Sequence, residues 1–239
     1  GKHVLCEKPL CFSGRQAEEL FEMAEKRGLV LMEAIKTAYC PGFQELLKTA
    51  QSGIIGEIKD VEACFTKLTD VNGRELCSEA CGGSFYELGS YVLLPIVKLL
   101  GTPKEVCFQS IRTGKNQADG FTKVHLIYED AFALAKTGLT VKSEGALIIS
   151  GTKGYILAES PWWLTRRFQV RFEDCSADKV YTFPFEGQGL RYEIKAFMEC
   201  IEKLENDGKC METALMPEDS VRIAEIMEAF EKTLPCKPL

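Results

Sequence analysis

Gly1-Lys-His-Val-Leu-Cys-Glu-Lys-Pro-Leu10 is the stretch that decides how this chain folds. The apolar run from His3 to Cys6 contains a β-branched residue, is too short for a helix, and predicts one buried strand. Proline has no N–H for a sheet ladder and disfavours helix in the preceding residue, so the strand ends at Lys8. In open α/β sheets, ligands bind outside such strand ends. Glu7 and Lys8 are therefore candidate site residues, although a solvated lysine is the more common case.

A helix and a second strand follow the first strand. Residues 13–28 place apolar side chains on one helical face, with Ser13 able to cap the start and Gly28 able to end it. The run Leu29–Met32 predicts a second buried strand. Strand, helix and strand form a βαβ unit, which implies parallel pairing. One such unit is only the tail of a doubly wound α/β sheet, so we expect residues 1–41 to be the remnant of a larger domain.

Residues 42–239 predict a second domain of the α+β class. Helices are expected at residues 42–52, 85–100, 190–205 and 217–234, and residues 69–81 are expected to form a loop. Strands are expected at residues 58–68, 105–112, 121–128, 131–140, 145–150, 155–158, 168–172 and 180–185, with hairpin turns at 129–130 and 151–154. Short strands joined by tight turns predict a mostly antiparallel open sheet with helices on one face. We expect the other face to meet a partner subunit in a homodimer or higher homo-oligomer.

The composition excludes several functional classes. The 239 residues carry a net charge of −6 and a pI of about 5.2, whereas a nucleic-acid-binding surface is normally basic. No apolar run is long enough to span a bilayer. The 11 cysteines form no C-x-x-C pair and the chain has two histidines, so no metal site is expected. Such cysteines fit small buried side chains in a reducing cytoplasm. Because the chain begins with glycine inside a motif and enters a strand directly, we expect a fragment without a signal peptide.

A second candidate site lies at Gly82-Gly-Ser-Phe-Tyr-Glu-Leu-Gly-Ser-Tyr91. On a helix, Glu87 and Tyr91 are four residues apart and share a face. Gly89 between them would let another backbone or a cofactor ring come close, which offsets the cost of about 1 kcal/mol for glycine inside a helix. The alternative is that Tyr91 is an ordinary amphipathic core residue with its hydroxyl at the surface.

Both stretches resemble the glucose–fructose oxidoreductase/inositol dehydrogenase (Gfo/Idh/MocA) family. The first is similar to its Glu-Lys-Pro signature, in which the lysine lies between the nicotinamide and the substrate hydroxyl. The second is similar to its glycine-rich helix, whose usual form ends Asp-x-Gly-x-His-x-x-Asp. This chain has Glu87, Tyr91 and Leu94 in place of the first aspartate, the histidine and the last aspartate. With tyrosine in place of the histidine, this chain resembles glucose–fructose oxidoreductase and dihydrodiol dehydrogenase, in which that tyrosine is the proton-transfer group.

The resemblance implies a Rossmann-type NAD(P)-binding domain for residues 1–41 and assigns roles to its site residues. Tyr91 and Lys8 become the catalytic pair, because a nearby ammonium lowers the pKa of a tyrosine and can bond a developing alkoxide. The implied cofactor contacts, to NAD or NADP, are Glu7, Lys8, Pro9 and Lys36. The implied substrate contacts are Lys8, Tyr39, Glu87 and Tyr91. For Lys36 and Tyr39 the match is looser, and a solvated lysine and a packed tyrosine remain open.

Two further patterns imitate functional motifs. Gly187-Gln-Gly189 follows a strand and precedes a helix, but the third glycine and the βαβ context of a dinucleotide fingerprint are missing. We interpret it as a turn and a helix entry. Trp162-Trp163-Leu-Thr-Arg166-Arg167 places aromatic rings beside arginines, as sugar- or nucleic-acid-binding segments do. In an acidic chain with one such cluster, packing on the sheet or a subunit contact is the preferred interpretation.

Three functional hypotheses remain. The first is an NAD(P)-dependent oxidoreductase that moves a hydride between nicotinamide and a carbinol of a sugar, polyol or related small molecule, here without the half of its Rossmann domain that holds the pyrophosphate. The second is a non-catalytic oligomerisation or ligand-binding module derived from that family. The third is an accessory domain of a larger sugar-nucleotide enzyme. We favour the first and expect the fragment alone to be inactive. We also expect a small-molecule substrate, no nucleic-acid partner and no membrane partner.

Overall fold

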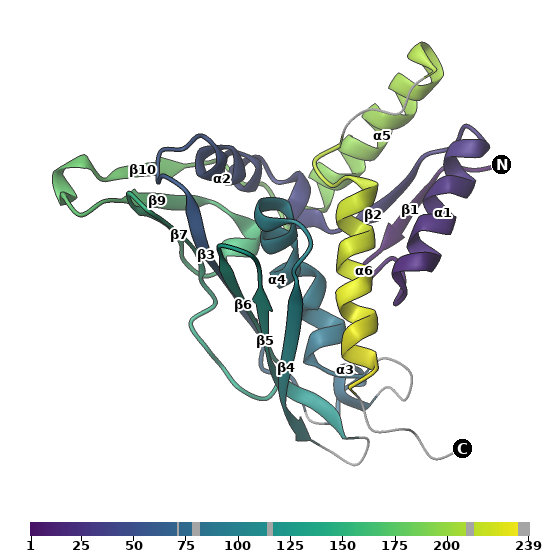
Figure 1. Cartoon of the computed structure of the whole chain (residues 1–239). Coiled ribbons are helices and arrows are strands. Elements are labelled where there is room, and N and C mark those ends of the chain that lie inside the picture. Colours follow the sequence, from purple (N-terminus) through teal and green to yellow (C-terminus); the bar gives the residue numbers. More distant parts are fainter. Residues whose placement is uncertain (71, 78–81, 114–116, 209–212, 234–239) are drawn as a thin grey trace.

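Two β-sheets of unequal size organise the chain (Figure 1). The computed structural model describes residues 1–70, 72–77, 82–113, 117–208 and 213–233, and within these ranges the strands form one sheet of two strands and one of eight. The predicted class, a short parallel βαβ tail followed by a broad open sheet with helices, is confirmed.

The small sheet is the predicted βαβ unit. Strand β1 (Val4–Glu7) and strand β2 (Leu31–Ala34) pair in parallel, with helix α1 (Gly14–Lys26) as the crossover. Strand β2 begins two residues later than expected. The cause is the end of α1, where Gly28 has φ +60° and the N–H of Leu29 bonds the carbonyl of Ala24 at 2.9 Å. Leu29 therefore belongs to the helix cap rather than to the strand.

The large sheet has the strand order β10-β9-β8-β7-β3-β6-β5-β4. Its pairs are antiparallel except β3 with β6, so the expectation of a mostly antiparallel sheet is confirmed. The two predicted hairpin turns, at residues 129–130 and 151–154, join β5 to β6 and β7 to β8. The strand bounds are β3 (Ile58–Thr66), β4 (Glu105–Thr113), β5 (Ala118–Ile127), β6 (Phe132–Gly138), β7 (Leu147–Gly151), β8 (Tyr155–Ala158), β9 (Arg167–Arg171) and β10 (Lys179–Thr182).

Helix α4 (Ser84–Leu100) lies at the centre of the core. It is apolar on nearly its whole circumference, as expected of a helix packed on two sides. One side contacts strands β3, β5 and β6, and the other contacts helix α6 (Pro217–Glu231), as Figure 1 shows. Helix α6 also packs against α1, so it joins the small sheet to the large one. Helices α2 (Pro41–Gln51) and α5 (Leu190–Asp207) contact the short 3-10 segment η1 (Lys36–Tyr39).

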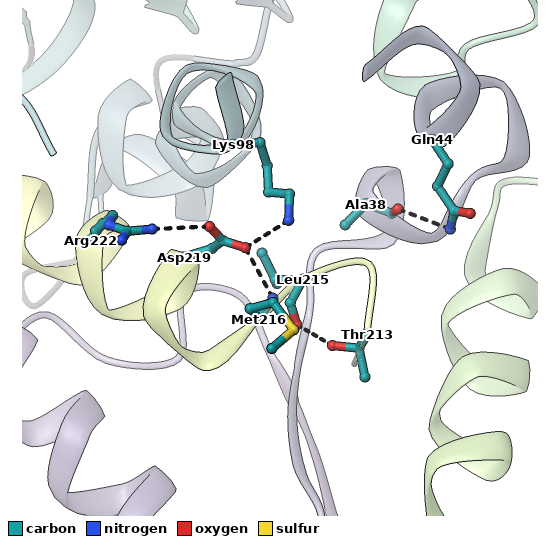
Figure 2. Close-up of polar contacts among 8 residues, drawn as sticks. All are labelled: Ala38, Gln44, Lys98, Thr213, Leu215, Met216, Asp219 and Arg222. Carbon is teal, nitrogen blue, oxygen red and sulfur yellow. Dashed lines mark hydrogen bonds and ion pairs between the residues drawn. The ribbon is translucent and has the colours of Figure 1, made fainter. Parts of the chain in front are cut away.

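A buried ion pair fixes α6 against α4 (Figure 2). Lys98 of α4 points at Asp219 in the first turn of α6, and its Nζ lies 2.9 Å from Oδ2. The same carboxylate accepts the Met216 N–H at 3.0 Å and faces Arg222 at 3.4 Å. Asp219 thus caps its own helix and neutralises Lys98. In the same view, the Gln44 amide donates to the Ala38 carbonyl at 3.3 Å and ties α2 to η1.

One expected loop contains a helical turn. Residues 69–81 were predicted to be a loop, but α3 (Arg74–Cys77) forms one turn there. The turn closes because Leu76 and Cys77 donate to the carbonyl of Gly73. Leu76 packs into the core, so a single apolar contact overrides the polar local pattern. The remainder of this prediction, at residues 71 and 78–81, lies outside the described residues.

Candidate active site

The structure brings Lys8, Glu87 and Tyr91 together. Lys8 follows the end of β1, and its side chain is 13% exposed. Its Nζ donates to the backbone carbonyl of Glu87 at 2.5 Å, lies 3.7 Å from the Glu87 carboxylate, and stands 5.5 Å from the centre of the Tyr91 ring. Two stretches that are about eighty residues apart in the sequence therefore meet at one place.

A buried glutamate holds the turn that carries Lys8. Glu33 of β2 is 2% exposed and accepts the N–H of Leu10 at 3.0 Å through Oε1. Burial raises the pKa of this carboxyl, while the bond from Leu10 and the charge of Lys8 lower it. The chain leaving β1 is thereby fixed on the neighbouring strand, which restricts where the Lys8 ammonium can lie.

A second buried carboxylate fixes the helix that carries Glu87 and Tyr91. Asp119 of β5 accepts three bonds through Oδ2: from the Ser84 hydroxyl at 2.7 Å, the Phe85 N–H at 2.8 Å and the Thr122 hydroxyl at 2.8 Å. Gly83 has φ +135°, and a Cβ there would stand 1.9 Å from Asp119 Oδ1. Glycine at residue 83, directly before α4, is thus required by the close approach of this carboxylate.

Gly89 has a different role from the one expected. A Cβ at this position would lie 3.1 Å from Met227 Cε of α6 and 3.2 Å from the Phe85 ring. The missing side chain therefore makes room for α6 on the core side of α4, rather than for a cofactor ring. The expected sharing of a face by Glu87 and Tyr91 is confirmed by their common neighbour, Lys8.

The ionisation of Tyr91 corrects a prediction. We expected Lys8 to lower the pKa of this phenol. In the structure, burial raises the pKa of Tyr91 above its ordinary value, and the charges of Glu7, Glu193 and Glu87 raise it further. Lys8 does not reverse this direction. Burial lowers the pKa of Lys8 itself, against the opposing influence of Glu87 and Glu7. Tyr91 is therefore held as a neutral phenol near neutral pH.

The two candidate residues of η1 differ in their surroundings, because Tyr39 packs in the core whereas Lys36 is half-buried. Tyr39 is 4% exposed, and its hydroxyl donates to the Glu33 carbonyl at 2.9 Å. Of the two alternatives for Tyr39, a substrate contact or a packed tyrosine, the structure has the packed tyrosine. It does not bring Tyr39 to Lys8. Lys36 is half-buried and lies close enough to Glu193 of α5 to lower the pKa of that carboxyl.

Glu193 is a residue of this region that sequence reasoning missed. It lies in the first turn of α5 and is 3% exposed, and within the described part of the chain its Oε2 has no hydrogen-bond partner. Burial and the charge of Glu7 raise its pKa to about 7, and Lys36 opposes them. The only signal was its place after Gly187-Gln-Gly189. That segment is confirmed as a turn and helix entry, with φ +62° and +92° at the two glycines.

An aromatic row adjoins Tyr91. The Trp163 ring stacks on Phe65 with centroids 3.6 Å apart, and Phe65 meets the Tyr91 ring edge-on at 5.4 Å. Trp162 is buried, and its Nε1 donates to the Cys64 carbonyl at 2.7 Å. The preference for sheet packing is thus confirmed for Trp162, whereas Trp163 is half-buried beside the candidate site.

Two negative findings apply to the described residues alone. Their histidine, cysteine, aspartate and glutamate side chains form no group of three or more that could hold a metal ion. None of the helices in this part of the chain has the length and apolar character needed to cross a membrane.

Lys8 meets Tyr91 between a parallel βαβ unit and an open sheet, and known families match both of these parts of the chain. Residues 43–157 match the GFO/IDH/MocA C-terminal domain, and residues 1–35 match the NAD-binding Rossmann fold of the oxidoreductase family. The chain belongs to the Gfo/Idh/MocA family of oxidoreductases and carries its C-terminal domain with only the end of its Rossmann domain.

Curated relatives resemble almost the whole chain. The scyllo-inositol 2-dehydrogenase (NADP(+)) IolU of Bacillus subtilis is 29% identical over 244 residues, which cover 98% of this chain and 71% of the relative. The trans-1,2-dihydrobenzene-1,2-diol dehydrogenase of Sus scrofa is 28% identical over 245 residues, with the same coverage of 98% and 71%.

A solved structure shares the fold. KijD10, a 3-ketoreductase from Actinomadura kijaniata in complex with NADP and TDP-benzene, superposes with a TM-score of 0.78 at 23% sequence identity. The match covers 96% of this chain and 70% of KijD10.

The residues present fit one end of a nicotinamide dinucleotide. Lys8 places a buried cation outside the carboxyl end of a parallel strand pair, where α/β sheets bind such ligands. Because the chain carries only the end of the Rossmann domain, the residues that would hold the remainder of the cofactor are not assigned here.

Proposed function

We propose that this chain is the catalytic part of an NAD(P)-dependent oxidoreductase that interconverts a carbinol and a carbonyl in a sugar, polyol or related small molecule. The observation that carries the proposal is the contact of Lys8 with both Glu87 and Tyr91, outside the carboxyl end of β1. A largely buried ammonium next to a phenol supplies a hydrogen-bond donor and a proton carrier side by side.

The neutral state of Tyr91 favours a direction. Bound NAD(P) or its reduced form supplies the hydride chemistry. In reduction, the Tyr91 O–H bond breaks and its proton goes to the substrate oxygen as the carbonyl becomes a carbinol. Lys8 donates to the same oxygen and stabilises the negative charge that develops on it. Because the pKa of Tyr91 is raised, Tyr91 carries its proton near neutral pH, which is the state from which reduction begins, whereas oxidation begins from a phenolate that this environment disfavours.

The substrate class rests on the relatives and on the walls of the site. The curated relatives are named for an inositol and a dihydrodiol, and KijD10 is named as a 3-ketoreductase. Trp163 is half-buried and stacks on the buried Phe65, which meets Tyr91, so the Trp163 ring offers an apolar surface on this side of Tyr91. Glu87, which is partly exposed, and Lys36 offer polar contacts. We assign Glu7, Lys8, Pro9 and Lys36 to the cofactor side, with either NAD or NADP as the cofactor, and Lys8, Glu87 and Tyr91 to the substrate side.

We also propose a homodimer formed through the uncovered face of the large sheet. One row of side chains crosses all eight strands on this face: Val180, Gln169, Leu157, Ile148, Glu62, Leu134, His125 and Cys107. Phe132 and Ile111 are exposed on the same face. The apolar members of this row, over which no helix of the described residues lies, support burial of the face against a second copy. Several free thiols, among them Cys6, Cys11 and Cys40, support a reducing, cytoplasmic setting.

The proposal is tested with the full-length protein. NADH or NADPH oxidation is followed with scyllo-inosose, a monosaccharide ketone and a cyclic vicinal diketone, and the reverse reaction with the matching alcohols. We expect turnover with at least one of them and a loss of at least about 100-fold in Lys8→Met. The exposed Lys59→Met is the matched control. Turnover that is unchanged in Lys8→Met would contradict the proposal and favour a non-catalytic module.

A further inference from the structure

Glu193 is a buried carboxylate whose pKa stays raised although the charge of Lys36 lowers it. It is 3% exposed, and its Oε2 lacks any hydrogen-bond partner within the described residues. By contrast, Asp219 is paired with Lys98 and caps its own helix. A buried charge without partners is strongly unfavourable, so such a group is relieved by taking up a proton.

The position of Glu193 is fixed by packing. Helix α5 contacts η1, and at its start a Cβ on Gly189 would stand 3.5 Å from the Cys40 thiol and 3.6 Å from the Lys36 side chain. The first turn of α5 therefore lies directly on the segment that leads away from β2. Glu193 belongs to that turn, so the packing of α5 on η1 fixes the place of its backbone.

Titratable groups from several elements surround this carboxylate. The groups whose charges act on the pKa of Glu193 are Glu7 at the end of β1 and Lys36 of η1, and the charge of Glu193 acts in turn on Tyr39 of η1, on Cys40 directly after it, and on Tyr91 of α4. Only Lys36 among these is a cation, and Glu7 repels the ionised form. The carboxylate is thus placed between one cation, one anion and the phenol of the candidate site.

We propose that Glu193 is a positioning residue whose charge decides how readily Tyr91 gives up its proton, an inference that rests on the proposed function. When Glu193 is neutral, the Tyr91 phenolate that forms during carbonyl reduction meets one negative charge fewer. When Glu193 is ionised, it opposes that phenolate and keeps the proton on Tyr91. The proton that Tyr91 gives to the substrate is replaced from water, and Glu193 itself bonds neither substrate nor cofactor.

The proposal predicts a pH dependence with a definite sign. The pKa of Glu193 is raised to about 7, so the carboxyl is neutral below that pH and ionised above it. We expect the rate constant of reduction to fall roughly two- to fivefold as pH rises through 7, because Tyr91 becomes a weaker acid. Glu193→Gln stays neutral and loses this step, whereas Glu193→Asp keeps it.

The stability of the chain gives a readout that needs no turnover. Because the folded state holds the Glu193 proton more tightly than the unfolded state, the wild type loses stability as pH rises from 4.5 to about 7. We expect Glu193→Gln to melt at the same temperature as wild type near pH 4.5 and about 4 °C higher at pH 8. Glu199→Gln, on the exposed face of α5, is the control and should not change this difference.

The deciding experiment is a pH titration of the ¹³C-tyrosine-labelled chain by NMR, in which the Tyr91 signal is the one absent from Tyr91→Phe. We expect the Tyr91 signal to shift with a midpoint near 7 in wild type and in Glu199→Gln, and to lose that step in Glu193→Gln. A step that persists in Glu193→Gln would overturn the proposal. Full-length protein that shows the coupling but reduces no carbonyl would instead overturn the proposed function. Full-length protein with activity but an unchanged pH profile in Glu193→Gln would overturn the positioning role alone.

Discussion

Asp119 and Glu193 are both buried carboxylates beside the start of a helix, but they differ in the hydrogen bonds that they accept. Asp119 lies under the start of α4 and takes three hydrogen bonds on one oxygen, from Ser84, Phe85 and Thr122. Glu193 lies in the first turn of α5, and its Oε2 has no partner within the described residues, as is also true of Asp119 Oδ1. Burial raises the pKa of both carboxyls, but only at Asp119 do hydrogen bonds oppose it.

This difference distinguishes a carboxylate that stabilises the fold from one whose charge can act on the candidate site. Asp119 is part of the frame that orients Tyr91, because it fixes the helix on which Tyr91 lies. The Oε2 of Glu193 takes no hydrogen bond within the described residues. Burial of this carboxylate therefore lowers the stability of the fold, which a residue with a purely structural role would not do. We infer that the α4 side of the site provides geometry and the α5 side provides its electrostatic setting.

Removal of the Asp119 carboxylate should have the largest effect on stability. Asp119→Ala leaves two hydroxyls and one N–H without their common acceptor in a buried place, so we expect a loss of about 4 kcal/mol. Urea denaturation measures it. Asp130→Ala, in an exposed turn, should stay within about 0.5 kcal/mol of wild type. Equal losses in the two variants would show that the three hydrogen bonds to Asp119 do not stabilise the fold.

Displacement of the same carboxylate by a methyl group should cost somewhat less. Gly83→Ala places a Cβ 1.9 Å from Asp119 Oδ1 and imposes φ +135° on alanine, so we expect a loss of about 3 kcal/mol. Gly101→Ala has a positive φ of 73° with open space around it and should lose only about 1 kcal/mol. A similar loss in both would show that backbone strain alone, and not the carboxylate, requires glycine at residue 83.

Loss of a single donor should weaken the Asp119 cluster slightly. Ser84→Ala removes one of three bonds, for an expected loss of about 1 kcal/mol by urea denaturation. Ser90, on the same helix, has a buried hydroxyl with no partner among the described residues, so Ser90→Ala should be neutral or stabilising. A loss in Ser90→Ala as large as that in Ser84→Ala would show that the hydrogen bond to Asp119 is not what makes Ser84 stabilising.

The smallest effect is expected on the Glu193 side. Lys36→Met removes the cation that lowers the pKa of Glu193 and should raise the value above about 7, whereas Glu7→Gln should lower it. Each change should be less than about one unit, since charges across a partly screened site exchange about 1 kcal/mol. Carboxyl ¹³C NMR, with Glu193→Gln to assign the signal, measures both. Shifts in the same direction would contradict the arrangement of charges.

Much of the fold was predictable because its signals are local. The βαβ unit follows from Pro9, Gly28 and two apolar runs, and the hairpins follow from their turn residues. The contact of Lys8 with Glu87 and Tyr91 was predictable through the family resemblance alone, since no local pattern connects residues so far apart.

The remainder depended on tertiary contacts that the sequence does not display. The role of Gly89 was wrong because its neighbour, Met227, comes from a helix 138 residues later. The direction of the pKa shift of Tyr91 was wrong because burial and the charges of three glutamates all raise the pKa of this phenol. Glu193 was missed because an acidic residue in the first turn of a helix is common on surfaces, and only packing on η1 makes it unusual.

The most direct test of the central claim is the rate constant of Tyr91→Phe in the full-length protein, measured for NADPH-dependent reduction of the best carbonyl substrate. Tyr155→Phe, an exposed tyrosine on β8, is the matched control. We predict a loss of about 100-fold or more in Tyr91→Phe, with an unchanged melting temperature, and no loss in Tyr155→Phe. A Tyr91→Phe enzyme that keeps its rate constant within about twofold would contradict the assignment of Tyr91 as the proton donor.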